Sequence, residues 1–567
     1  MFRQRAHLAA SLFFAASAAV LTYPWLAHGY LFSADEFMHA YNVCVLDELL
    51  FGGDPHGYAA WFALNPWPEP NLFGHSVLLG LTQVVPLYVA EKLLLLCIPV
   101  ALGYAFLARR DPLRASAAPP AVSAAGWWWR AALGVLALGF ACGLVLRHGF
   151  LNYLIGMSIA LAAATATAGA GRSGRWSISA WALLLYLCHP IPLLLFGGFV
   201  ALREALHRGL VTEWLAPRAG RWGGFAVDLL RWFGLPLALL VAYHLRHAGD
   251  GALGSGSLRR LGGFAIAYGD LVLFDGGEML GAVGLYALAV ACCACGLLAL
   301  LRTGGSAGTL AVGTLGALVI IVVAVPDVLS GGAYIYQRVR PFVFAWGLFF
   351  AAHGATAYGA AGLRYVASRE RRLLVAALSV GVAVCVGALT ASRAASVAGA
   401  AAELGDLRAL GERLPAGSAV LPVGAPSTPL SSGDFSSPFH HFAGALGCER
   451  GIVLVDNYEA FVGYFPLVWR EGRDPFAAMT RGVEARPADI PEGARAYFLA
   501  HVDFVLSRGT LERTLSPSTA AWMAECLVPF AEDPRGRYLL YAVVEPTDVV
   551  ASERLEPATG YMIPRSR

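Results

Sequence analysis

Two adjacent carboxylates, Asp35 and Glu36, follow the first long apolar run of the chain at residues 7–27. This run is long enough to cross a bilayer, which takes roughly 20 apolar residues. Carboxylates just after such a span lie at the membrane surface. There one of them could take a proton from a substrate held at the bilayer edge. Asp35 is the first candidate for this base, with Glu36 or His39 supporting it.

A helix over residues 34–50 would position these side chains. Asp35, His39 and Asn42 are spaced i, i+4 and i+7, so they would share one face of the helix. Ser33 is a good N-cap, and the helix dipole favours negative charge in the first turn. Acidic residues often occupy helix starts for stability alone, so a purely stabilising role of the pair is an equal alternative.

The composition is that of a membrane protein. Of the 567 residues, 57% are hydrophobic and only 14% are charged, against about 25% charged residues in soluble domains. The formal net charge of +3 is too small to indicate nucleic-acid binding. We therefore expect membrane lipids as partners and no nucleic acid.

Apolar runs of spanning length predict about eleven transmembrane helices. They lie near residues 7–27, 80–107, 129–146, 150–170, 175–188, 190–205, 223–246, 279–301, 308–326, 341–362 and 373–393. The pair 175–188 and 190–205 could instead be one helix kinked at Pro190, but the arginine-rich loops favour two spans. The same charge rule places the N-terminus in the cytoplasm, and an odd number of spans places the C-terminal tail outside.

The chain changes character near residue 400. Residues 1–398 form the predicted transmembrane domain, with a first outside loop at about 28–79, and residues 399–567 form a predicted soluble α/β domain. Its short apolar runs are SAVLPV, GIVLVDN, DFVLSRG and RYLLYAVV, and its helical-looking stretches are ELGDLRALGERL and GARAYFLAHV. The fold class is thus an all-α polytopic membrane protein with a C-terminal α/β domain. Cys448 and Cys526 could pair if this domain is outside the cytoplasm.

The layout of the first 400 residues resembles the GT-C superfamily of polyprenyl-phosphate-sugar-dependent glycosyltransferases. In that superfamily an outside loop with Asp-Glu or Asp-x-x-x-His follows the first span, and the pair Asp35-Glu36 is similar to the pair in protein O-mannosyltransferases. Further stretches resemble bacterial members: NPWPEPNLFGHSVLLG, GFLNYLIGMSIAL, LCHPIPLLL and PDVLSGGAYIYQRVRPF. The resemblance implies an enzyme of the bacterial inner (plasma) membrane. It would move a sugar from a polyprenyl-phosphate donor to a glycan, lipid or protein acceptor on the outer face, with inversion at the anomeric carbon.

A leaving phosphate needs positive charge, and the segment before a late span offers Arg338 and Arg340. The planar guanidinium group can bind two phosphate oxygens. The alternative is that both arginines anchor the span to lipid headgroups. The pair Arg259 and Arg260 is a weaker candidate.

Other polar residues at predicted outside turns are candidates for substrate binding: Asn42, His75, His148, Asn152, His189, Tyr334 and Gln337. The pair His440-His441 in the tail lacks a metal-ligand spacing with another His or Cys. No metal or cofactor is assigned, although Asp35, Glu36 and His39 could hold a divalent metal if the donor were a lipid diphosphate.

A transporter or flippase of a lipid-linked or small polar substrate is the main alternative function. Transporters tend to carry ionisable residues within their spans and to contain internal repeats. Here no repeat is evident, and ionisable residues cluster at span ends, apart from Glu91-Lys92. A binding module held by a membrane anchor ranks last, because one span suffices as an anchor.

Overall fold

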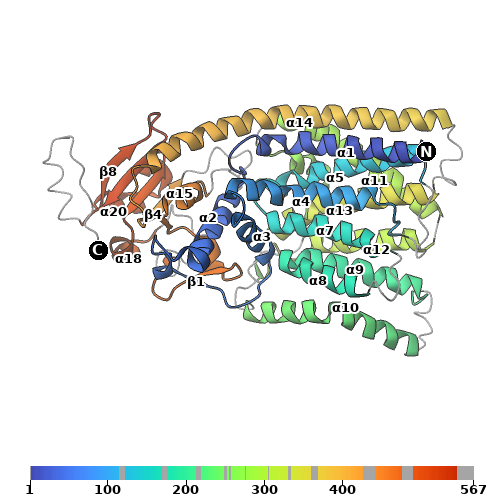
Figure 1. Ribbon diagram of the computed structural model, residues 1–567, viewed down its shortest axis with the longest axis horizontal. Coiled ribbons are helices and arrows are strands. Elements are labelled where there is room, and N and C mark those ends of the chain that lie inside the picture. Colours follow the sequence, from blue (N-terminus) through green and yellow to red (C-terminus); the bar gives the residue numbers. More distant parts are fainter. Residues whose placement is uncertain are drawn as a thin grey trace. The chain divides into compact units, whose positions relative to one another are not determined.

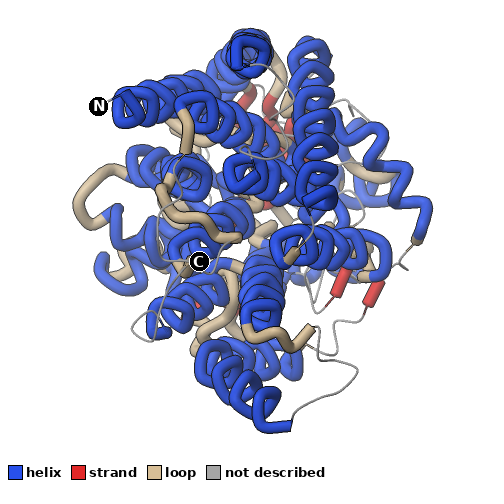
Figure 2. Tube along the Cα trace, turned by 90° about the vertical axis from the view of Figure 1, so that its right-hand side faces the viewer, coloured by secondary structure: helices blue, strands red, loops and turns tan. Residues whose placement is uncertain are grey.

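The computed structural model describes residues 2–113, 122–168, 175–211, 219–247, 252–253, 257–274, 276–303, 305–329, 334–358, 368–424, 441–475 and 490–545. Helices, drawn blue in Figure 2, make up most of this part of the chain. The chain divides into two compact units whose segments alternate along the sequence. The first unit comprises Met1–His28, Pro68–Gly74 and Lys92–Val397, and the second comprises Gly29–Trp67, His75–Glu91 and Ala398–Arg567.

The first unit consists mainly of long helices that pack alongside one another (Figure 1). They are α1 (Phe2–Leu26), α4 (Leu87–Leu107), α5 (Ala124–Ala141), α6 (Leu144–Arg147), α7 (Leu151–Ala166), α8 (Arg175–Cys188), α9 (Pro190–His207), α10 (Ala219–Arg246), α11 (Met279–Thr303), α12 (Ser306–Ala324), α13 (Ile335–Tyr358) and α14 (Ser368–Gly411). The unit also contains the 3-10 segment Leu258–Leu271 and a short antiparallel pair of β2 (Ala252–Leu253) with β3 (Val328–Leu329). The division between the units falls within α4, α14 and a further helix, α3 (Leu72–Thr82).

Eight helices of the described chain are long and apolar enough to cross a membrane, which is compatible with a multi-pass membrane protein. They are Gln4–Leu26, Leu87–Leu107, Ala124–Arg147, Pro190–His207, Arg221–Arg246, Gly276–Arg302, Ser306–Ala324 and Arg372–Gly411. The predicted count of eleven spans is not confirmed. Helices α7 and α8 have 16 and 14 residues, fewer than the roughly 20 that a bilayer requires.

Two predicted spans illustrate how proline sets helix boundaries. The apolar stretch 80–107 is interrupted, because α3 (Leu72–Thr82) ends before Pro86 and α4 begins directly after it. Helices α8 and α9 are separate, as the arginine pattern predicts, and meet at His189, whose Nδ1 accepts the N–H of Ile191. Pro190 opens α9 because the first helical position needs no N–H.

Close helix contacts in the first unit depend on glycine. A Cβ atom at Gly103 in α4 would lie 2.9 Å from the Phe14 ring of α1, and one at Gly156 in α7 would lie 2.9 Å from Cys188 Cβ of α8. Small residues of this kind let helix backbones approach within a membrane, where apolar burial supplies little driving force between helices.

The second unit contains a five-stranded mixed sheet with the strand order β5-β4-β7-β9-β8. Its strands are β4 (Ala419–Gly424), β5 (Val453–Leu454), β7 (Phe504–Arg508), β8 (Leu527–Glu532) and β9 (Tyr538–Val543). Strand β4 pairs in parallel with β5 and β7, and β9 pairs antiparallel with β7 and β8. The parallel strands β4 and β7 are buried almost throughout, which explains their continuous apolar sequence.

Short helices and a second strand pair complete this unit. The helices are α2 (Glu36–Asp47), α3, α15 (Gly444–Arg450), α16 (Tyr458–Val462), α18 (Arg495–His501), α19 (Leu511–Thr514) and α20 (Pro517–Ala524). Strand β1 (Phe62–Leu64) pairs antiparallel with β6 (Leu467–Trp469). The segment after the first span therefore folds together with the C-terminal part of the chain.

A disulfide joins Cys44 of α2 to Cys448 of α15, and the two cysteines are 404 residues apart in sequence. Beside it, the Tyr41 hydroxyl accepts the N–H of Leu454. Pairing of Cys448 with Cys526, which the sequence left open, does not occur, because Cys526 is a free, buried thiol.

Removing this disulfide by replacing Cys44 and Cys448 with Ser should destabilise the second unit by about 2–5 kcal/mol, the usual loss for a native bond of a small secreted domain. Limited proteolysis along a urea series measures the change. The exposed Cys295 provides the control, since Cys295→Ser should leave protease resistance unchanged. Free thiols at both positions in never-reduced protein would contradict the pairing.

Candidate functional site

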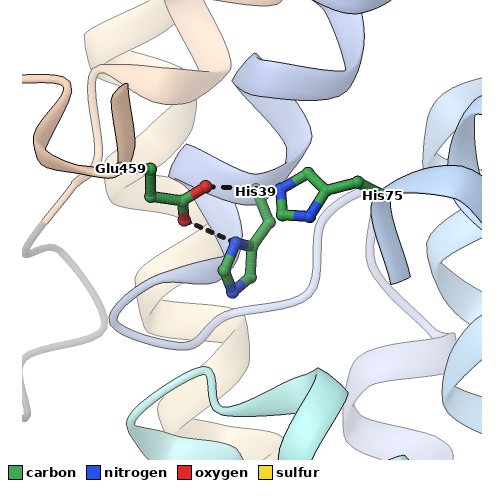
Figure 3. Close-up of side chains that lie close together, drawn as sticks. All are labelled: His39, His75 and Glu459. Carbon is green, nitrogen blue, oxygen red and sulfur yellow. Dashed lines mark ion pairs between the residues drawn. The ribbon is translucent and has the colours of Figure 1, made fainter. Parts of the chain in front are cut away.

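Three ionisable side chains, His39, His75 and Glu459, meet inside the second unit (Figure 3). His39 Nδ1 lies 2.5 Å from Glu459 Oε1, and His75 Nε2 lies 3.3 Å from Glu459 Oε2. The two imidazole rings are perpendicular, with centroids 5.0 Å apart. All three residues are buried, and Glu459 is fully inaccessible to solvent. One carboxylate thus bridges two imidazoles away from water.

Each of the three side chains comes from a different helix. His39 lies in α2, His75 in α3 and Glu459 in α16. Asn457 caps α16, because its side-chain oxygen accepts the N–H of Ala460. This cap fixes where α16 begins and so places Glu459 in its first turn.

A chain of amide hydrogen bonds holds the bridging carboxylate. Asn42 Nδ2 donates to Glu459 Oε2 at 2.6 Å, and Asn457 Nδ2 donates to Asn42 Oδ1 at 2.7 Å. The Phe465 ring lies 5.8 Å and 5.6 Å from the two imidazole rings, measured between centroids, and adds an apolar wall. Asn42, a predicted site residue, therefore supports the carboxylate by a direct hydrogen bond.

The electrostatics of the cluster follow from its burial. Burial alone would lower the pKa of His39, but the negative charge of Glu459 and its hydrogen bond raise that pKa to about 10. Burial would raise the pKa of Glu459, but the charges and hydrogen bonds of the two histidines hold it well below its ordinary value. Without another cation, His39 and Glu459 form an ion pair at neutral pH.

Glu36 lies one helical turn before His39 and is fully buried. Neither of its carboxylate oxygens has a hydrogen-bond partner among the described residues. Burial raises the pKa of Glu36 to about 7, against the opposing charge of His39, and the negative charges of Glu459 and Asp35 contribute to the rise. An unsatisfied buried carboxyl group is costly and often marks a functional site.

Asp35 precedes α2 and faces a second histidine. His441 Nε2 lies 3.8 Å from Asp35 Oδ1, and His441 Nδ1 lies 3.7 Å from Asp456 Oδ2. The His441 ring stacks on Tyr458 with centroids 4.9 Å apart. The side chain of Asp35 is 18% exposed, so a ligand can reach its carboxylate, whereas Glu36 is inaccessible.

The residue at the N-cap of α2 differs from the one that the sequence predicts. Asp35, not Ser33, occupies the N-cap position. Among the described residues, the Asp35 side chain accepts no hydrogen bond from the first turn of the helix. Helix capping therefore does not explain the presence of this carboxylate.

Several other predicted residues gather around Phe150 in the first unit. Arg338 Nη1 lies 3.0 Å from His189 Nε2, and the Arg338 guanidinium carbon lies 3.7 Å from the centroid of the Phe150 ring. The His148 ring stacks on Phe150 at 5.2 Å and lies 5.9 Å from the Tyr334 ring. The structure thus brings these four predicted residues into one cluster.

The remaining predicted residues of the first unit have mainly structural contacts. Arg340 forms an ion pair with the buried Asp270, with Nε 2.8 Å from Oδ2. Asn152 Oδ1 accepts the N–H of Gly74 at 2.6 Å, and its amide nitrogen donates to a backbone carbonyl. Gln337, in α13, has a buried side-chain oxygen without a hydrogen-bond partner in the described part of the chain.

Sequence reasoning did not identify Glu459, Asn457 or His441 as site residues. They lie in the tail without a recognisable motif, far from α2 in sequence. The pair His440-His441 was set aside for lack of ligand spacing, and His440 lies outside the described residues. No local signal connects these positions to His39, because tertiary folding alone brings them together.

Neither known family models nor curated proteins match this sequence. Its chemistry is therefore inferred from the geometry of the second unit. Asp35 offers an accessible carboxylate beside an imidazole, which suits proton abstraction. His39, His75 and Glu459 each offer one ligand atom, all within 4.8 Å of one another, and this set could hold a metal ion.

Replacing Glu36 by Gln should stabilise the second unit at pH 8 and have little effect at pH 5, measured with a chelator present. The pKa of Glu36 is raised on folding from 4.5 to about 7. Its ionisation therefore opposes folding above pH 4.5, and the penalty reaches its full size, about 3 kcal/mol, above pH 7. The neutral Gln side chain removes this penalty.

Thermal unfolding of the second unit at pH 5 and pH 8 measures this difference. Glu48→Gln is the matched control, because Glu48 is partly exposed and paired with His56 at 2.6 Å. The control should gain no stability at pH 8. A Glu36→Gln variant less stable than the native chain at pH 8 would contradict the assignment of an unfavourable buried charge.

Proposed function

We propose that the protein is an integral membrane glycosyltransferase of GT-C type, as the layout of its sequence suggests. It moves a sugar from a polyprenyl-phosphate donor to a hydroxyl group of a glycan, lipid or protein acceptor on the outer face of the membrane. Asp35 is the proposed general base. The observation that carries the proposal is the solvent-accessible Asp35 carboxylate at the N-cap position of α2, whose Oδ1 lies 3.8 Å from His441 Nε2.

The proposed reaction is a single displacement. The acceptor hydroxyl gives its proton to Asp35 while its oxygen bonds to the anomeric carbon of the sugar. The bond from that carbon to the lipid phosphate breaks, and the phosphate leaves with the electron pair. A positioned base of this kind contributes roughly 10²–10⁴-fold to the rate. His441, next to Asp35, would stabilise the ionised carboxylate before transfer.

Taken by itself, the first unit offers a candidate ligand for a phosphate group of the donor. Asp270 neutralises Arg340, so this role in the proposal falls to Arg338. Stacking on Phe150 and the contact with His189 fix the guanidinium of Arg338 in position. A guanidinium group that is already fixed in position loses less conformational entropy on binding two phosphate oxygens than a mobile one does.

The disulfide between Cys44 and Cys448 supports an extracytoplasmic second unit. Disulfides form and persist in oxidising compartments such as the bacterial periplasm and are rare in the cytoplasm. This is the side on which a lipid-linked sugar would be used in the proposed reaction.

Asp35→Asn should reduce sugar transfer by roughly 10²–10⁴-fold, because Asn cannot accept the proton. The assay uses the purified full chain with a panel of radiolabelled polyprenyl-phosphate sugars and follows loss of label from the lipid. Asp47→Asn is the control, since Asp47 lies in the same helix and pairs with Gln83 at its exposed end. Transfer at the native rate by Asp35→Asn would remove Asp35 from the mechanism.

The same assay separates an enzyme from a transporter. If the folded native chain turns over no donor, and vesicles containing it accumulate or flip a lipid-linked substrate, the protein is a transporter and the proposal fails.

Arg338→Gln should raise the apparent KM for the lipid donor by more than about tenfold, because the phosphate loses a charge-assisted hydrogen bond worth about 1.5–3 kcal/mol. Initial rates over a donor series measure this change. Arg302, an exposed arginine in the last turn of α11, is the control, and Arg302→Gln should leave KM near its native value. If both substitutions raise KM equally, the increase reflects the lost positive charge in general and not a phosphate contact of Arg338.

A further inference from the structure

We infer that His39, His75 and Glu459 form a binding site for a divalent transition-metal ion such as Zn²⁺, with Glu36 as a fourth ligand. The four residues come from α2, α3 and α16 of the second unit. This inference does not depend on the proposed sugar transfer, because the ligand atoms of His39, His75 and Glu459 lie within 4.8 Å of one another whatever reaction the protein catalyses.

The spacing of the ligand atoms suits a single ion. Metal–ligand distances of about 2.0–2.2 Å place neighbouring ligands of a tetrahedral zinc site about 3.3 Å apart. The Glu459–His75 separation is 3.3 Å, and the Glu459–His39 separation is 2.5 Å. The ligand atoms of all three residues lie within 4.8 Å of one another and are grouped on one side of Glu459 (Figure 3). Two imidazoles with carboxylates are a common ligand set of zinc and of related first-row ions.

The charges favour a doubly positive ion over a single proton. Glu36 and Glu459 are both fully buried, and Glu459 contacts the imidazoles of His39 and His75. A proton shared between His39 and Glu459 neutralises only that pair and does not satisfy either oxygen of Glu36. A divalent cation bound by neutral imidazoles would balance both carboxylates, and buried charges are generally paired or bound to metals.

Glu36 is the proposed fourth ligand. It precedes His39 by three positions on α2, and residues spaced i and i+3 share one face of a helix. Its oxygens are buried and have no hydrogen-bond partner among the described residues. Because this carboxyl group is fully buried and adjacent to the three-residue cluster, its lack of a partner is an observation independent of the His–Glu contacts.

The surroundings of the cluster resemble the supporting shell of a metal site. Ligating carboxylates are usually fixed by hydrogen bonds from residues that do not touch the metal. Here Asn42 donates to Glu459, and Asn457 holds Asn42. The Phe465 ring borders both imidazoles and limits solvent access.

Metal content tests the inference without any assay of activity. The full chain is purified in detergent, stripped with a chelator, dialysed against Zn²⁺ and measured by inductively coupled plasma mass spectrometry. We expect one equivalent of Zn²⁺ per chain, and Co²⁺ in its place should give visible absorption typical of a nitrogen- and oxygen-ligated ion. Zn²⁺ should also raise the unfolding temperature of the second unit, because it binds only the folded site.

Conservative variants assign the ligands. His75→Gln and Glu459→Gln should each weaken Zn²⁺ binding at least 100-fold, and Asn42→Ala should weaken it 10–100-fold through loss of support to Glu459. Glu36→Gln should weaken binding and change the Co²⁺ spectrum. His56→Gln is the matched control, because His56 pairs with Glu48 in the same unit but outside the cluster, and it should bind like the native chain.

Two results would overturn the inference. One is native protein that takes up less than about 0.1 equivalent of Zn²⁺ and Co²⁺ at neutral pH, with the Cys44–Cys448 disulfide intact as evidence of folding. The other is native-like affinity in both His75→Gln and Glu459→Gln, which would place the ion elsewhere. Asp35→Asn should bind Zn²⁺ normally, so a metal site without sugar transfer would leave this inference standing while the proposed function fails.

Discussion

The folding of the second unit depends on one buried negative charge, the carboxylate of Glu459. Removing a carboxylate from water costs several kcal/mol unless opposite charges and hydrogen bonds satisfy it. Glu459 obtains them from His39, His75 and Asn42. These partners precede it by hundreds of residues, so its burial is stable only if the segments after the first span fold together with the tail. The β1–β6 pairing and the disulfide between α2 and α15 enforce the same arrangement.

The two acidic residues at the start of α2 have different environments. Asp35 keeps access to solvent and faces His441, whereas Glu36 is fully buried and near enough to His39 and Glu459 for their charges to shift its pKa. Neighbouring carboxyl groups with such different surroundings cannot be interchangeable. The buried carboxyl group of Glu36 by itself lowers the stability of the fold. Groups of this kind are typically retained at functional sites.

The sequence predicts local elements well where the physical signal is local. The run 7–27 corresponds to α1, and the arginine pattern correctly separates α8 from α9. In the tail, the runs SAVLPV, GIVLVDN, DFVLSRG and RYLLYAVV overlap β4, β5, β7 and β9. The count of spans is less predictable, because Pro86 divides one apolar stretch and short helices such as α7 are apolar without reaching spanning length. Glu459 could not be found from the sequence, since nothing around it indicates a contact with His39.

The disulfide between Cys44 and Cys448 also has a consequence for how the protein is made. It closes a loop of 404 residues, so most of the chain lies inside one covalent ring. The ring and the bridging carboxylate become available only after the ribosome has passed Glu459. At roughly 5–20 residues per second, α2 exists for roughly 20–80 s before its partners are synthesised. During that interval Cys44 has no disulfide partner, and His39 has no Glu459 carboxylate to pair with.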